Sequence, residues 1–153
     1  VNNLGKDLIQ GDTIRYAGLR FDVLWPMEKR EIFSENETSV VGMLTFGEFQ
    51  ALFTADIGEP TELALTESGV LKKLTVLKVP HHGSKYSSSQ KFLEAVLPKE
   101  AIVSVGKKNT YGHPAAEIMM RYDTLRSRVW RTDKNSEVEV VTDGKTYQIM
   151  SLN

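Results

Sequence analysis

Four polar residues of this 153-residue chain have the types and positions needed for metal or proton chemistry. His81 and His82 are adjacent and follow an apolar run that is typical of a strand. The only other histidine, His113, follows a second such run, and Asp56 ends a third. Imidazole and carboxylate groups are common ligands of catalytic zinc, and imidazole also transfers protons near neutral pH. A metal site is therefore the first hypothesis.

Each of these residues also has an ordinary structural explanation. Asp56 either binds one or two metals or caps the helix that follows it. A lone histidine is more often packed than coordinating, but two adjacent histidines point in different directions. One of the pair can then coordinate while the other orients it or forms a hydrogen bond. His113 is either a proton donor or phosphate contact, or a histidine of a surface loop.

Further polar groups surround the same segments. After Gly83 the chain offers Ser84, Lys85 and the run 87–89, which supply hydroxyls, a charge and a helix N-terminus for an anion. The alternative role of these serines is helix capping. Lys107 and Asn109 come shortly before His113 and are expected at the mouth of the same site.

Composition limits the possible functions. The chain has no cysteine, which excludes disulfides, thiolate zinc sites and a cysteine nucleophile. No apolar run approaches the roughly 20 residues of a membrane span, so a soluble domain is expected. The net charge is −1, yet residues 72–108 hold eight lysines against two glutamates. This basic segment would suit a phosphate-bearing substrate, or its lysines simply cover exposed helices.

The pattern of apolar residues predicts a mixed α/β domain with a central sheet. Polar motifs fall at the carboxyl ends of strands, where α/β sheets bind their ligands. A polar loop is expected over 27–37. Strands are expected at 14–16, 20–25, 38–46, 49–55, 74–79, 101–105, 128–131, 138–142 and 146–152, and helices at 59–68, 87–97 and 115–125.

Six short segments together resemble the metallo-β-lactamase superfamily, and in particular the hydrolase domain of ComEC-type DNA-uptake (competence) proteins. The resemblance covers nearly the whole chain and implies the second half of an αβ/βα sandwich, with helices on one face of a mixed sheet. The segments are Asn36–Val41, Leu52–Ile57, Leu77–Ser84, Ser104–Asn109, Tyr111–Pro114 and Arg131–Asp133.

The resemblance also implies roles for the polar residues. Asp56 matches the aspartate that bridges two metals, zinc or manganese, and His82 matches a ligand of one of them. His81 is then expected beside the ligands, in a supporting position. Catalytic roles in proton transfer or charge stabilisation fall to His113 and Lys85. Substrate contacts are expected from Ser84, Lys107 and Asn109.

The chain departs from the superfamily in two ways. Ala55 stands where the family usually has glycine. The main metal motif, His-x-His-x-Asp-His, is absent, since no histidine precedes position 81. We therefore expect residues 1–153 to be one partial domain that lacks the first half.

Two functions follow as expectations. The intact parent is expected to be a metal-dependent hydrolase of DNA phosphodiesters, membrane-anchored or otherwise cytoplasmic, while this chain alone binds metal weakly and is inactive. The alternative is a non-catalytic interaction module. Half of a sandwich would expose an apolar sheet face, which a homodimer could cover.

Overall fold

The computed structural model describes residues 7–27 and 35–152, and its first half is an antiparallel meander. Successive strands are joined by tight turns at Ala17-Gly18 and Gly47-Glu48, as the sequence predicts. Residues 28–34 of the expected loop lie outside the described residues, and a 3₁₀ turn covers Glu35–Thr38. The strands of this half are β1 (Thr13–Tyr16), β2 (Leu19–Trp25), β3 (Val41–Phe46) and β4 (Phe49–Phe53).

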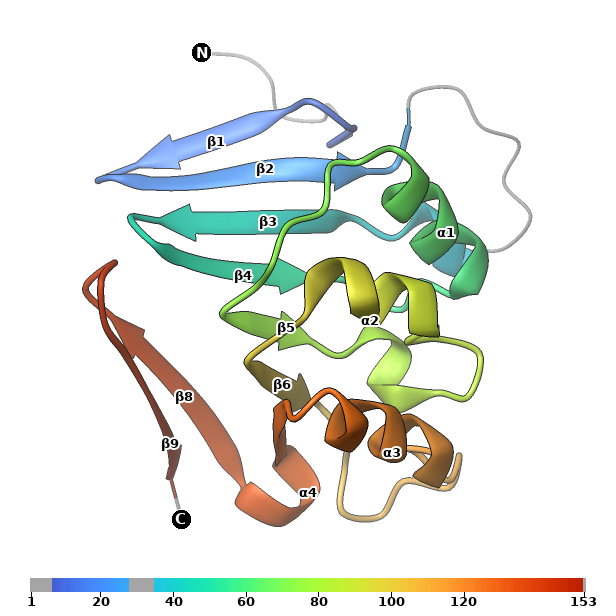
Figure 1. Cartoon of the computed structure of the whole chain (residues 1–153). Helices are drawn as coiled ribbons and strands as arrows, with labels where there is room; N and C mark the ends of the chain where they lie inside the picture. The colour runs from blue at the N-terminus through green and yellow to red at the C-terminus, as the bar shows by residue number, and fades with distance from the viewer. Residues whose placement is uncertain (1–6, 28–34, 153) are drawn as a thin grey trace.

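The second half extends the same sheet with parallel strands (Figure 1). Helices α1 (Glu59–Glu67), α2 (Gln90–Val96) and α3 (Ala116–Thr124) connect them. The strands are β5 (Val76–Lys78), β6 (Glu100–Val103) and β7 (Arg128–Arg131), and the sheet order is β1-β2-β3-β4-β5-β6-β7. Because β4 to β7 are parallel, their carboxyl ends meet at one edge.

The three helices cover one face of the sheet and form the main core (Figure 1). One row of paired residues crosses the sheet on this face: Met43, Leu52, Leu77 and Ala101. All four are buried against helix residues such as Phe92. A fully buried leucine contributes about 1.5–3 kcal/mol, so this layer holds the parallel strands in place.

A C-terminal hairpin packs on the opposite face of the sheet. It consists of β8 (Glu137–Thr142) and β9 (Tyr147–Leu152), and follows the short helix α4 (Thr132–Asn135). Val140 and Ile149 cover Phe49, Ala51 and Val76. The observed layers confirm the predicted mixed α/β fold with α1 to α3 on one face.

Several predicted elements are shorter than expected, among them the strand predicted over 38–46, which spans Val41–Phe46, and the strand predicted over 49–55, which spans Phe49–Phe53. The strand predicted over 74–79 spans only Val76–Lys78. The helix predicted over 87–97 begins at Gln90 because Ser88 has a left-handed backbone (φ 55°) and Ser89 an extended one. No helix within the described ranges is long and apolar enough to cross a membrane.

The start of α2 is bonded to α1 through a buried carboxylate. Glu62 is fully buried, and its two oxygens accept the backbone N–H groups of Ser88, at 2.5 Å, and Ser89, at 2.8 Å. Ser88 also bonds to α3, since Arg121 donates to its carbonyl at 2.8 Å and its hydroxyl lies 3.0 Å from that of Tyr122. Glu62 and Ser88 therefore connect all three helices.

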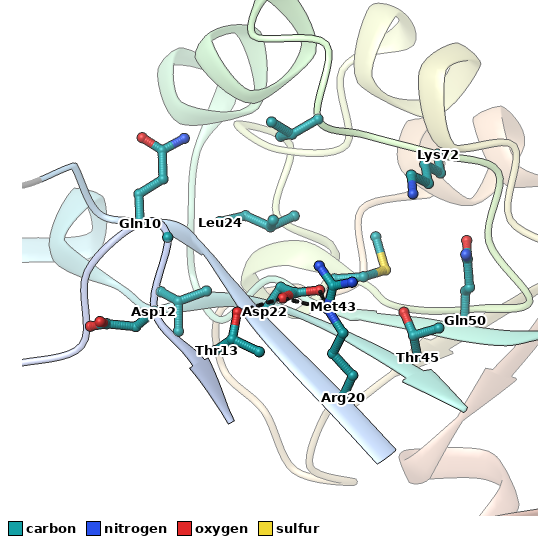
Figure 2. Close-up of a pocket in the computed structure, with 13 residues that line it drawn as sticks. Gln10, Asp12, Thr13, Arg20, Asp22, Leu24, Met43, Thr45, Gln50 and Lys72 are labelled. Atoms are coloured by element: carbon teal, nitrogen blue, oxygen red, sulfur yellow. Dashed lines mark hydrogen bonds and ion pairs between the residues drawn. The ribbon is translucent and has the colours of Figure 1, made fainter. Parts of the chain in front are cut away.

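A polar cavity of about 450 Å³ lies on the helix side of β1 to β4, apart from the histidines (Figure 2). At its floor, Asp22 accepts hydrogen bonds of 2.8 Å from Arg20 and from Thr13. Burial opposes ionisation of Asp22, but these bonds and the Arg20 charge still hold its pKa below the usual 3.8. The two hydrogen bonds hold the side chains of Thr13, Arg20 and Asp22 in place at the edge of the sheet.

Candidate metal and substrate site

The structure brings Asp56 and His82 together at the carboxyl edge of the parallel strands. Asp56 follows β4 and His82 follows β5, and these neighbouring strands are parallel. His82 Nε2 lies 3.4 Å from Asp56 Oδ1, and both side chains are partly open to solvent. The residues predicted as metal ligands are thus adjacent in space although 26 positions separate them in the sequence.

The orientation of His82 is fixed by the end of the next strand. Its Nδ1 lies 2.6 Å from the carbonyl oxygen of Ser104, which follows β6. A carbonyl can only accept, so Nδ1 must donate a proton, and the neutral ring then carries its lone pair on Nε2. That lone pair belongs to the nitrogen that lies 3.4 Å from the Asp56 carboxylate. Two electron-pair donors 3.4 Å apart can both coordinate one metal cation.

A tight turn carries the two histidines. His81 and His82 have φ angles of 46° and 56°, and Gly83 has 80°, so three successive residues are left-handed. Such angles cost energy for side chains with a Cβ, and they persist where the surroundings impose them. Here the N–H of His81 donates to the carbonyl of Ala55 at 3.0 Å, which joins the turn to the Asp56 loop.

A third loop brings His113 to the same place. The N–H of Ala115 donates to the carbonyl of Gly83 at 2.9 Å, and this bond joins the start of α3 to the histidine turn. Asn109 holds the His113 backbone from both sides: its Oδ1 accepts the N–H at 3.0 Å and its Nδ2 donates to the carbonyl at 2.9 Å. The ring of His113 lies 5.9 Å from that of His81, centroid to centroid.

The surroundings of His113 favour its neutral form. Burial lowers its pKa below 6.5, and the nearby His81 and His82 lower it further, while Asp56 acts in the opposite direction. A neutral imidazole can accept a proton or offer a hydrogen bond at neutral pH, as the predicted catalytic role requires.

The other predicted residues occupy varied positions around the site. Asn109 and His113 line an open cavity of about 450 Å³ that also borders His82. Lys85 and Lys107 are exposed. Ser84 is buried, and its hydroxyl accepts the N–H of Tyr86 at 3.4 Å. The roles assigned to these side chains remain predictions.

The sequence did not indicate the role of Thr132, the first residue of α4, which directly follows β7. Its hydroxyl donates to the carbonyl of Val105 and accepts the N–H of the same residue, both at 2.8 Å. These two hydrogen bonds fix the loop after β6. They also fix the carbonyl of the preceding residue, Ser104, which orients His82. The string Arg131-Thr132-Asp133 was part of the motif resemblance, but no spacing rule assigned the threonine a function.

The donors present fit part of a metal site. Within the described ranges, no group of three or more histidine, aspartate or glutamate side chains is arranged to hold a metal. Asp56 and His82 supply two protein ligands, whereas a catalytic zinc takes about three and a water.

Comparisons with known proteins show which proteins the chain is similar to. No protein-family model matches it. It is 34% identical over 134 residues to ComE operon protein 3 of Bacillus subtilis, and 32% identical over 126 residues to competence protein ComA of Neisseria gonorrhoeae. The chain is similar in sequence to a segment of each of these proteins. These matches cover 88% and 82% of the chain.

The competence relatives are much longer than the matched region. The chain spans 17% of the Bacillus subtilis protein and 18% of the Neisseria gonorrhoeae protein. Among solved structures, it resembles a proposed metal-dependent hydrolase of Parabacteroides distasonis with a TM-score of 0.56. That likeness covers 84% of this chain and 58% of the other at 14% identity, so it concerns the fold. The predicted resemblance to a segment of competence proteins is confirmed.

Proposed function

We propose that this chain is part of a metal-dependent hydrolase that cleaves phosphodiester bonds in DNA. The observation that carries the proposal is the pairing of Asp56 Oδ1 with the lone pair of His82 Nε2, 3.4 Å apart, at the end of parallel strands. The competence relatives and the hydrolase-like fold support it.

Each residue has a part in this proposal. Asp56 and His82 would hold a divalent cation, and the Ser104 carbonyl keeps Nε2 turned toward it. A bound cation would polarise a phosphoryl oxygen and lower the pKa of a bound water. His113, whose surroundings favour the neutral ring, would accept or relay a proton.

Charge supports a phosphate-bearing substrate. The segment 72–108 carries eight lysines and two glutamates, and it contains the histidine turn. Lys85 and Lys107 both follow this turn in the sequence, and both are exposed. Such cations attract a polyanion and hold its phosphates.

The test is hydrolysis of a labelled single-stranded oligonucleotide by the full-length product of the gene, with added Mn²⁺ or Zn²⁺. We expect Asp56→Asn and His82→Ala each to lower kcat/KM at least 100-fold, because each removes a metal ligand. Asp123→Asn, an exposed aspartate on α3, is the matched control and should leave the rate unchanged. Cleavage of a β-lactam without cleavage of DNA would overturn the proposal, as would variants as active as the wild type.

A second candidate function, a homodimeric interaction module, is favoured by an apolar patch on the hairpin side of the sheet. Ile14 and Phe21 face each other there across β1 and β2, in the row that also contains Leu44 and Ala51. Ile14 is 52% exposed, and Phe53 on β4 is exposed as well. Patches of this kind mark interfaces.

Light scattering after gel filtration tests this second function. We expect a dimer that Ile14→Lys converts to a monomer, while Met120→Lys, at an exposed apolar position on α3, leaves the dimer intact. A stable monomer of the unaltered chain at all concentrations would exclude the homodimer.

A further inference from the structure

Tyr111 presents an open aromatic ring at the rim of the candidate site. It lines the same cavity as His82 and His113, yet the residue is 83% exposed. Its ring stacks on the His113 ring, with centroids 6.0 Å apart and planes inclined by 17°. The fold gains little from an aromatic side chain that remains so exposed, so packing does not explain its position.

The loop that carries Tyr111 is held in place. Asn109 donates its backbone N–H to the carbonyl of Gly106 at 3.1 Å, and its side chain forms both bonds to the His113 backbone. The ring therefore sits between two anchored positions, 109 and 113. A preorganised aromatic surface loses little entropy when a planar ligand stacks on it.

Cations and a second exposed ring accompany Tyr111. Lys107 and Lys108 are exposed on its own loop. Tyr86, 67% exposed, has the ammonium of Lys85 5.0 Å from its ring centroid, and its carbonyl accepts the N–H of Glu59, close to the Asp56 loop. Aromatic rings thus border both the Asp56 loop and the His113 loop.

We propose that Tyr111 is a stacking platform for an unpaired nucleobase, and that the site thereby selects single-stranded DNA over duplex. Exposed aromatic rings interleaved with lysines are how proteins bind single strands: the rings stack on bases and the cations track phosphates. Duplex bases are already stacked on one another and cannot offer their faces. The proposal rests on the proposed function, since it names which form of DNA reaches the Asp56–His82 pair.

The test measures binding in EDTA, so that it does not depend on metal or on hydrolysis. Fluorescence anisotropy compares three ligands of equal length: a dT 20-mer, a 20-mer of abasic sites and a 20-base-pair duplex. The wild type should bind dT more tightly than either of the others. Tyr111→Ala should weaken dT binding about 5- to 150-fold and leave abasic binding unchanged, because only the base stack is lost.

Tyr111→Phe is the matched variant, because it keeps the ring and should keep the affinity for dT. A circular dichroism melt of each variant checks folding, which truncation of so exposed a side chain should not disturb. Equal loss on dT and abasic strands, or no loss on dT, would overturn the proposal. The two proposals can fail separately. If Tyr111→Ala weakens binding to dT but Asp56→Asn does not affect hydrolysis, the metal chemistry is refuted and the stacking role of Tyr111 stands.

Discussion

Gly83→Ala is expected to destabilise the chain by about 2–5 kcal/mol. A Cβ at this position would lie 2.5 Å from Cβ of Pro114 and 3.1 Å from its Cα, so the two loops that carry the histidines would have to separate. The residue also has φ 80°, which costs an alanine roughly 1–2 kcal/mol. Overpacking adds roughly 1–3 kcal/mol. Urea unfolding followed by circular dichroism measures the sum.

Gly69→Ala separates these two contributions. Gly69 has a similar φ of 70°, but a Cβ there would meet nothing within 4 Å. It should therefore cost only the backbone strain, roughly 1–2 kcal/mol. If Gly83→Ala is no worse than Gly69→Ala, then the Pro114 contact relaxes easily and the turn is not tightly fixed.

Glu62→Ala is expected to cost about 3–5 kcal/mol, because it leaves the N–H groups of Ser88 and Ser89 without their acceptor inside the helix layer. Glu62→Gln should cost less, about 1–3 kcal/mol, since its amide oxygen still accepts one of the two bonds. Glu59→Gln, an exposed position on the same helix, is the matched control and should be nearly neutral.

The same residue gives a pH dependence with a definite sign. Burial raises the pKa of Glu62 above 4.5, although the bonds from Ser89 and Ser88 oppose this. As pH rises above 4.5, Glu62 loses its proton in the unfolded chain but keeps it in the folded chain, until the pH reaches the raised pKa. The advantage of the wild type over Glu62→Gln should therefore be largest below pH 4.5 and should narrow above it, up to the raised pKa. An advantage that widens with pH would show that the two N–H groups prefer the charged carboxylate.

The sequence predicted those parts of the site that consist of side chains at the ends of strands. The family resemblance paired Asp56 with His82, and the structure brings them together because parallel strands have their carboxyl ends at one edge. Apolar runs likewise predicted β5 and β6, although β5 proved shorter than expected and ends at the half-buried Lys78.

The orientation of His82 and the start of α2 could not be predicted, because backbone atoms and long-range contacts determine them. The acceptor that orients His82 is the main-chain carbonyl of Ser104, and any residue type supplies that group. The start of α2 depends on Glu62, 26 positions before Ser88, where a local rule expected a serine cap. Sequence patterns of short range cannot report either contact.

The links between the Asp56 loop, the histidine turn and the start of α3 run from main chain to main chain, between Ala55 and His81 and between Gly83 and Ala115. Apart from Gly83, which has no room for a Cβ, the side chains of these loops can therefore be exchanged without removing the bonds that position them. Such a scaffold is suited to divergence. A descendant or a designed variant can replace Asp56 or His113 with other donors and acquire a new chemistry on an unchanged support.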